Sequence, residues 1–316
     1  MSKYRSRLPQ LTGGLYLSDG GLETSLIYHE GLDLPYFAAF PLLRSPEGRD
    51  ALASYFRRFV AVAKSRGLRF ILRNATWRSN PDWASKLDIG PSVLDSIILD
   101  AVSFAIALRD EFEHVSTRPV VVNGVVGPRG DGYTISNAMS VEEARAYHAA
   151  QIQSFKAAGA DMVSAITMNY AEEGVGIALA ARDAQMPLVI SFTVETDGRL
   201  PSGMALGEAI DMVDKQTRIY PIYFMINCAH PSHFEEAVGQ NAAWLKRIHG
   251  VRANASTKSH AELDVATTLD AGDPIDLGKR YRALKGSLPA MNVLGGCCGT
   301  DHRHIAAICE AVLPAN

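Results

Sequence analysis

The stretch Pro119-Val120-Val121-Val122-Asn123-Gly124-Val125-Val126-Gly127 decides the fold of this chain. Its apolar side chains follow one another without the apolar–polar alternation of a strand that has one face in water. A nearly continuous apolar run is typical of a strand buried on both faces, as in a parallel sheet covered by helices. The stretch Pro187-Leu188-Val189-Ile190 shows the same pattern. The sequence therefore predicts a buried parallel sheet.

Runs of this kind recur along the whole chain. They cover residues 15–21, 69–76, 119–127, 161–168, 187–194, 223–230, 250–256 and 292–299. A segment with helical periodicity follows each run; one has its apolar positions at Leu94, Ile97, Ile98, Ala101, Ala105 and Leu108. Such strand–helix units in 316 residues predict an α/β fold, a single (β/α)8 TIM barrel forming one domain over residues 1–316. An open doubly wound sheet is the alternative, but its Gly-x-Gly-x-x-Gly turn is missing after the first run.

Composition narrows the class of protein. Apolar residues make up 47% of the chain and charged residues 21%, which is ordinary for a globular protein with a large core. A formal charge of −3 gives no reason to expect a nucleic-acid partner. The basic N-terminus precedes no apolar stretch, so we expect no signal peptide, and we expect no segment of about 20 apolar residues for a membrane. A cytoplasmic location follows, while the oligomeric state is left open.

Three of the four cysteines are candidates for a metal site. Cys297 and Cys298 stand in Gly295-Gly296-Cys297-Cys298-Gly299-Thr300, where the glycines permit a sharp turn that aims both sulfurs at one point. Cys228 ends the sixth run, and three thiolates suit Zn²⁺ with an open fourth position. His230 is either a fourth ligand or an ordinary loop histidine. Cys309 is better explained as a core residue, because it shares an apolar helical face with Ile305, Ile308 and Val312.

Other polar or aromatic residues follow the predicted strands at the barrel end where active sites lie. Asp19 precedes two glycines after the first run, and we favour a site role for it over a plain turn. Trp77 and Trp83 follow the second run. They either shape a cation–π pocket for a methyl sulfonium or simply pack in the core.

The expected chemistry follows from the charge of the metal site. Zn²⁺ with three thiolates carries a formal charge of −1, which makes it a poor Lewis acid for a carbonyl. Such a site can bind a substrate thiol, remove its proton at neutral pH and keep its sulfur nucleophilic. We therefore expect methyl transfer to sulfur from a sulfonium or ammonium donor, with both substrates held in line.

The chain resembles the zinc-dependent homocysteine S-methyltransferases, which are single (β/α)8 barrels. The resemblance rests on Asp19-Gly20-Gly21-Leu22-Glu23-Thr24, on Asn227-Cys228 and on the paired-cysteine segment from Gly295 to Thr300. It implies that Cys228, Cys297 and Cys298 hold Zn²⁺ and that the substrates are small molecules, a thiol acceptor and a methyl donor. The length is similar to that of members that use S-methylmethionine or S-adenosylmethionine to convert homocysteine to methionine. We expect substrate contacts from Asp19, Glu23, Asn227 and Thr167.

One position departs from the family pattern. The family places a glutamate after the fourth strand to bind the substrate ammonium, and this chain has Ile166 there. Either another carboxylate takes over, with Glu23, Glu195 and Glu262 as candidates, or the acceptor differs. The alternatives to a homocysteine methyltransferase are thus an enzyme for another small thiol or a selenol, and a non-catalytic barrel that binds zinc or a ligand.

Overall fold

The predicted barrel is confirmed. The computed structural model describes residues 2–116 and 118–314, and its eight parallel strands close into a barrel in chain order. The strands are β1 (Tyr16–Leu17), β2 (Arg69–Arg73), β3 (Val120–Val126), β4 (Met162–Met168), β5 (Leu188–Phe192), β6 (Tyr223–Asn227), β7 (Ile248–Ala253) and β8 (Val293–Gly296). Several are shorter than the apolar runs that predicted them, since the chain leaves the sheet early to form the loops described below.

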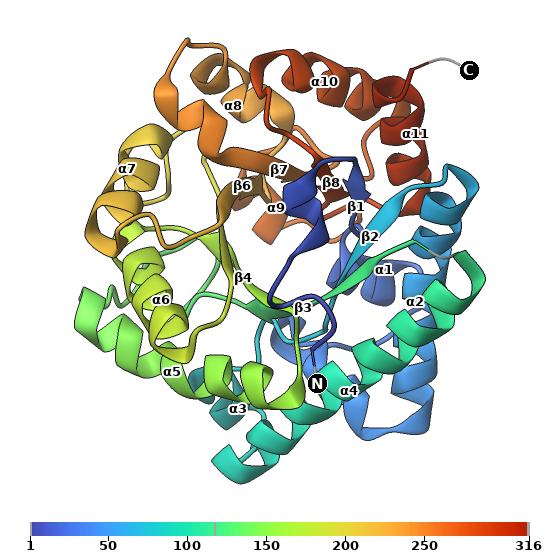
Figure 1. Ribbon diagram of the computed structural model, residues 1–316, viewed down its shortest axis with the longest axis vertical. Coiled ribbons are helices and arrows are strands. Elements are labelled where there is room, and N and C mark those ends of the chain that lie inside the picture. The colour runs from blue at the N-terminus through green and yellow to red at the C-terminus, as the bar shows by residue number, and fades with distance from the viewer. Residues whose placement is uncertain (1, 117, 315–316) are drawn as a thin grey trace.

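Helices surround the barrel (Figure 1). The α-helices are α1 (Leu22–Tyr28), α2 (Pro46–Ser65), α3 (Pro81–Lys86), α4 (Pro91–Ser116), α5 (Val141–Ala158), α6 (Ala171–Ala184), α7 (Leu206–Thr217), α8 (Pro231–Val238), α9 (His260–Asp264), α10 (Pro274–Ser287) and α11 (His302–Val312). Short 3-10 turns are η1 (Pro9–Thr12), η2 (Pro35–Phe37), η3 (Phe40–Arg44) and η4 (Ala243–Arg247). Several helices begin at a residue whose side chain caps the first turn. At α5, for example, Ser140 and Glu143 form a reciprocal capping box.

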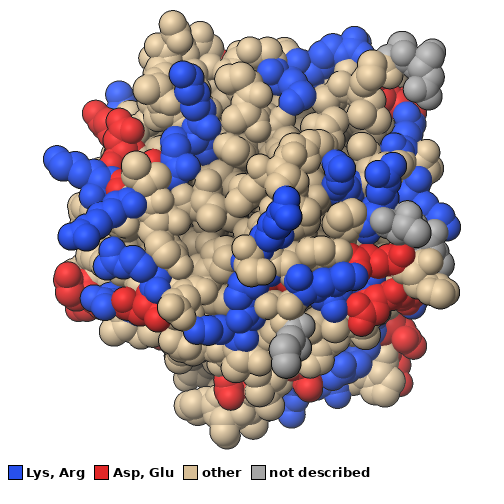
Figure 2. Space-filling model, in the orientation of Figure 1, with Lys and Arg blue, Asp and Glu red and all other residues tan. Residues whose placement is uncertain are grey.

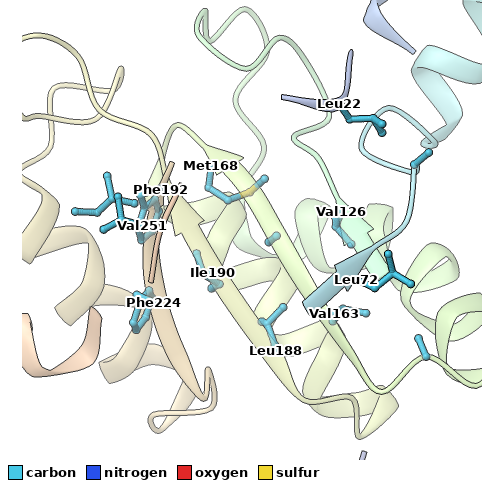
Figure 3. Close-up of a cluster of buried hydrophobic side chains, with 14 of the residues drawn as sticks. Leu22, Leu72, Val126, Val163, Met168, Leu188, Ile190, Phe192, Phe224 and Val251 are labelled. Atoms are coloured by element: carbon cyan, nitrogen blue, oxygen red, sulfur yellow. The ribbon is translucent and has the colours of Figure 1, made fainter. Parts of the chain in front are cut away.

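Alternate side chains of each strand face two different cores. The outward set packs beneath the helices, and Figure 3 shows part of it, including Leu72, Val163 and Phe192. The inward set fills the lower interior with Ile71, Val121 and other large residues. Higher up, the inward positions become polar or charged, and these positions support the site.

The N-terminal segment closes the lower end of the barrel. Leu8 packs into the inner core, and the backbone N–H groups of Lys3 and Tyr4 both donate to the Asp161 carboxylate just before β4. Figures 1 and 2 view the molecule from this end, where basic side chains lie across the face and acidic ones lie mainly toward its rim. The carboxyl ends of the strands therefore lie on the far side, at the end where barrel enzymes place their chemistry.

One described helix differs from the expectation about membrane segments. Residues Pro91–His114 of α4 are long and apolar enough, by length and composition, to cross a membrane. The core helix of a soluble protein passes the same test, and here α4 packs on η3, β3 and α5 with Ile98, Val102 and Ala105 buried. Barrel packing thus explains the apolar character of this helix.

Candidate metal centre

Three cysteine sulfurs converge at the carboxyl end of the barrel. Cys228 directly follows β6, and Cys297 and Cys298 directly follow β8. The Sγ atom of Cys228 lies 2.9 Å from that of Cys297 and 3.6 Å from that of Cys298. Tetrahedral Zn²⁺ with bonds of about 2.3 Å separates its sulfur ligands by roughly 3.8 Å, so a small adjustment fits a metal between them. The described residues thus contain a three-cysteine cluster able to hold a metal ion.

A tight turn places the two adjacent cysteines on the same side. The N–H of Thr300 donates to the carbonyl of Cys297 at 3.1 Å, and Gly299 has φ +79°. This is the pattern of a type II turn, which requires a residue with positive φ at its third position. A Cβ atom at Gly299 would also lie 2.7 Å from the Asp270 carbonyl oxygen. Glycine is therefore needed here on two independent grounds.

The Asp19-Gly20-Gly21 motif packs directly on this turn. The N–H of Gly21 donates to the carbonyl of Thr300 at 3.0 Å, and a Cβ atom at Gly21 would lie 2.6 Å from the Cys297 carbonyl oxygen. The Thr24 hydroxyl in turn accepts from the N–H of Gly299. The loops after β1 and β8 are thus one packing unit, which explains why the two motifs occur together in this chain.

Asp19 does not line the cavity of about 530 Å³ that opens above the sulfurs. Its fully buried carboxylate accepts from Arg73 Nε at 2.7 Å, from Arg252 Nη1 at 2.9 Å and from the Tyr55 hydroxyl at 3.0 Å. Burial alone would raise the pKa of Asp19, but Arg252 and Arg73 outweigh it and hold the pKa below its ordinary value. This differs from the direct substrate contact expected from sequence, because the surrounding donors already occupy the carboxylate.

The two arginines also act on the cysteines. The hydrogen bond between Cys297 and Cys228 holds the pKa of Cys297 well below its ordinary value, and the charges of Arg252 and Arg73 add to this effect. The same hydrogen bond raises the pKa of Cys228. The cluster therefore already stabilises one thiolate, which is the form that binds a metal.

Tyr133 and His260 cover the sulfur cluster. The Tyr133 hydroxyl lies 3.1 Å from Cys228 Sγ and 3.8 Å from Cys298 Sγ. Its ring stacks on His260, with centroids 3.9 Å apart, and His260 Nε2 donates to the Cys228 carbonyl at 2.6 Å. Burial raises the pKa of Tyr133 well above its ordinary value, and the neighbouring cysteines act in the same direction. The hydroxyl thus keeps its proton and can donate to a sulfur.

Asn227 and Thr167, two expected substrate contacts, bind each other. The Asn227 amide donates to the Thr167 hydroxyl at 2.8 Å and accepts from the Thr167 N–H at 3.0 Å. Thr167 has φ +66° where the β4–β5 register shifts, and it lines the cavity beside Ile166. Asn227 is fully buried and lies outside the cavity lining. Its role in the structure is therefore to brace this irregular stretch of β4.

A cavity of about 530 Å³ opens above the sulfurs. Ile166 and Glu23 both line it, and Glu23 accepts from Arg73 Nη2 at 3.2 Å. The other two candidate glutamates do not: Glu195 pairs with His260, and Glu262 caps the start of α9. Of the three replacements proposed for the missing glutamate, the structure places only Glu23 at the cavity.

The tryptophan pair is already occupied by cations of the chain itself. The Arg78 guanidinium lies 4.3 Å from the Trp77 ring centroid and 3.9 Å from that of Trp83. Lys86 lies 3.9 Å from the Trp83 ring. Both tryptophans line the cavity, but their rings already contact a guanidinium, which favours a packing role over a sulfonium pocket.

The remaining candidates lie away from the sulfurs. His230 caps α8, with its Nδ1 atom 2.7 Å from the Ser232 hydroxyl, and is not part of the cysteine cluster. Cys309 is fully buried in the outer core on α11. Burial raises the pKa of Cys309 to about 11, as expected of an unreactive core thiol.

A family model described as Homocysteine S-methyltransferase matches residues 16–312. The chain belongs to the homocysteine S-methyltransferase family. The match covers every strand of the barrel and all three cysteines, so membership agrees with the site. A comparison with curated protein sequences gave no match.

Solved structures of the homocysteine methyltransferase MmuM from Escherichia coli are similar to this family member. The metallated form has a TM-score of 0.72 at 20% identity, with 96% of this chain and 99% of MmuM covered. The oxidized form has a TM-score of 0.72 at 19% identity, covering 97% and 99%. The apo form has a TM-score of 0.66 at 18% identity, covering 98% and 100%. At this identity the likeness concerns the fold.

Proposed function

We propose that this protein is a zinc-dependent methyltransferase that moves a methyl group from a sulfonium donor, S-methylmethionine or S-adenosylmethionine, to the thiol of homocysteine, giving methionine. The observation that carries the proposal is the convergence of Cys228, Cys297 and Cys298 at the floor of a cavity able to hold small molecules. These three residues would hold Zn²⁺. When bound there, the metal supplies a site at which an acceptor thiol loses its proton at neutral pH while its sulfur stays nucleophilic.

The chain's own residues would orient the reactants. Arg73 and Arg252, fixed by Asp19, set the charge beneath the sulfurs, and the Tyr133 hydroxyl is in position to donate to a sulfur above them. Apolar side chains, Ile166 and Leu34 among them, form much of the cavity wall and would pack against the methylene groups of the substrates. Holding an acceptor sulfur in line with a donor methyl group supplies much of the rate, because the bimolecular step becomes intramolecular in effect.

A methyl-transfer assay with a panel of substrates tests the function. S-methylmethionine, S-adenosylmethionine and betaine are each combined with homocysteine, other small thiols and a selenol. We expect turnover with a sulfonium donor and homocysteine. Transfer only to another thiol or to a selenol would show that homocysteine is not the acceptor. Such an acceptor is the second candidate because Ile166 replaces the expected glutamate. Metal binding without transfer to any acceptor would support a non-catalytic barrel.

Direct binding of the thiol at the metal gives a separate prediction. On saturation with homocysteine, the X-ray absorption edge of the zinc-loaded protein should gain one sulfur neighbour in place of an oxygen. The Cys228, Cys297 and Cys298 set provides three sulfurs before substrate and four after it. A spectrum that still fits three sulfurs would exclude this mode of thiol activation, even if zinc remained bound.

The proposal also covers the domain organisation and the cellular location of the protein. One domain over residues 1–316 and a cytoplasmic location are both part of it. Free thiols at Cys228, Cys297 and Cys298 support the location, because a reducing compartment keeps such groups available to a metal.

A further inference from the structure

An amino-acid substrate needs partners for two charges, and the wall formed by β4 offers neither. Ile166 lines the cavity with an apolar side chain, and Thr167 beside it is hydrogen-bonded to Asn227. Glu23 is held by Arg73. Other charged side chains that line the cavity come from the loops after β2, β3 and β7, and some of them are less fully engaged.

Arg78 presents a guanidinium edge that the protein does not fill. Its side chain is only 8% exposed and lines the cavity, with its guanidinium close to the rings of Trp77 and Trp83. Nη1 donates to the Gly130 carbonyl at 3.0 Å. Nε has no hydrogen-bond partner in the described residues, and Nη2 reaches Asp131 only at 3.4 Å. Nε and Nη2 form the edge that binds a carboxylate with two parallel hydrogen bonds.

The charge of Arg78 is also incompletely balanced. Burial lowers the pKa of its guanidinium, and Asp131 offsets this only in part. Arg73 shows the opposite balance, because Asp19 and Glu23 together raise its pKa well above the ordinary value despite burial. Arg252 also lines the cavity and has an unpartnered Nε, but its charge is paired with Asp19 at 2.9 Å. Arg78 is therefore the cavity arginine whose environment is best completed by an added anion.

Two carboxylates, those of Asp131 and Asp264, line the cavity near Arg78. The Asp131 carboxylate accepts from the backbone N–H groups of Tyr133 and Thr134 but stays partly exposed. The Asp264 carboxylate has no hydrogen bond or ion pair among the described residues. Burial and the nearby Asp131 raise the pKa of Asp264, while His260 and Arg78 lower it less. Both residues line the cavity. A cation placed between them would relieve this repulsion.

We propose that Arg78 binds the α-carboxylate, and Asp131 with Asp264 the α-ammonium, of the amino-acid substrate. This inference rests on the proposed function and names how the same cavity recognises its ligand. The position suits a molecule that also reaches the metal, because Tyr133 follows Asp131 closely in the chain and extends from it to Cys228. The apolar wall at Ile166 then contacts the methylene chain. The head group belongs to the acceptor or to an amino-acid sulfonium donor, which the experiment separates.

The test pairs deletions in the ligand with deletions in the protein. The kcat/KM for homocysteine is compared with that for 3-aminopropane-1-thiol, which lacks the carboxylate, and for 4-mercaptobutanoate, which lacks the ammonium. Each deletion should cost the unmodified protein about 10- to 100-fold, as loss of a hydrogen bond to a charged group does. In Arg78→Gln the cost of losing the carboxylate should fall to within about threefold. In Asp264→Asn the cost of losing the ammonium should likewise fall to within about threefold.

Control variants remove nearby charges that do not line the cavity. Lys86→Gln alters the same tryptophan cluster, and Glu262→Gln removes a carboxylate two residues from Asp264 on α9. Both should keep the full discrimination among the three thiols. The same comparison is made for the donor with S-methylmethionine, with 4-(dimethylsulfonio)butanoate, which lacks the ammonium, and with (3-aminopropyl)dimethylsulfonium, which lacks the carboxylate. If only the donor ratios collapse, the donor is the bound molecule. If neither set of ratios changes in Arg78→Gln and Asp264→Asn, the proposal is overturned.

A binding measurement keeps this result separate from the methyl-transfer activity. Calorimetric titration of the zinc-loaded protein with methionine should give at least about 10-fold weaker binding for Arg78→Gln than for Lys86→Gln. Equal affinities would overturn the head-group assignment even if methyl transfer occurs. Failure of every thiol in the activity assay would instead reject the proposed function, while the methionine titration still decides the assignment. Asp264 is exposed, so its variant gives a readout that does not depend on tolerance of a buried change at Arg78.

Discussion

Replacement of Cys297 by serine should remove the metal and lower methyl transfer by more than about 100-fold. Loss of an outer partner of a metal ligand already costs about 10- to 100-fold in affinity or activity, and here a ligand itself is lost. A serine hydroxyl stays protonated at neutral pH and is a far weaker ligand for Zn²⁺ than a thiolate. Cys297 is also the cysteine whose pKa the site lowers, whereas the pKa values of Cys228 and Cys298 are raised. Elemental analysis of the purified, reduced protein measures the zinc content, which we expect to be about one ion per chain before substitution.

The matched control is Cys309→Ser. Cys309 lies in the outer core on α11, so this change should leave zinc content and activity intact while causing a modest loss of stability. Cys228→Ser and Cys298→Ser should behave like Cys297→Ser. Retention of a full equivalent of zinc by Cys297→Ser, together with its loss from Cys309→Ser, would contradict the ligand assignment.

The barrel was predictable because its signal is local and repeated. Runs such as Val120-Val121-Val122 indicate strands that are buried on both faces. Because these runs alternate regularly with helical segments, few arrangements of the strands in a sheet are possible. The strand ends were not predictable to the residue. Thr167 stays inside β4 with positive φ because Asn227 holds its backbone from a neighbouring part of the barrel, and the amino-acid pattern of β4 alone carries no sign of this contact.

The cysteine cluster was predictable for a different reason. Glycines around Cys297 and Cys298 specify an unusual turn, and Cys228 ends a strand of the same barrel, so topology brings the sulfurs together. The roles of Arg73 and Arg252 went unrecognised although the sequence carries a signal for them. Each is a charged residue near the carboxyl end of a strand whose neighbouring positions are apolar, and a buried charge requires a buried partner. That partner is Asp19, which sequence analysis assigned to the substrate.

The two residues that cover the sulfur cluster, Tyr133 and His260, could not be predicted from the sequence. Tyr133 lies in a polar loop and His260 begins a short helix, and neither position has a distinctive pattern. They meet only because the loops after β3 and β7 fold over the same strand ends. Asp264 could not be found for the same reason. The polar segment of α9 is typical of a solvated helix, and only the structure shows that Asp264 lines the cavity together with Arg78 and Asp131.

Replacement of Asp19 by asparagine should lower the free energy of unfolding by about 3–5 kcal/mol. Removal of one partner of a buried ion pair leaves an uncompensated charge, and here both Arg73 and Arg252 lose their shared carboxylate. Asp19 contacts no sulfur of the cluster, so zinc content should remain near one ion per chain while activity falls through displacement of the two arginines. Urea denaturation measures the stability change, and elemental analysis measures the metal.

The pH dependence of this loss provides an internal check. Because the folded protein holds the pKa of Asp19 below its unfolded value, the stabilisation is fully present above the unfolded pKa of about 3.9 and is lost as the pH falls through the folded pKa. The stability gap between the unmodified protein and Asp19→Asn should therefore be constant from pH 8 to about pH 5 and shrink in stronger acid. Asp183→Asn, which removes an exposed partner of Arg145, should cost at most about 1 kcal/mol. An equally small cost for Asp19→Asn would mean that the two arginines do not depend on this carboxylate.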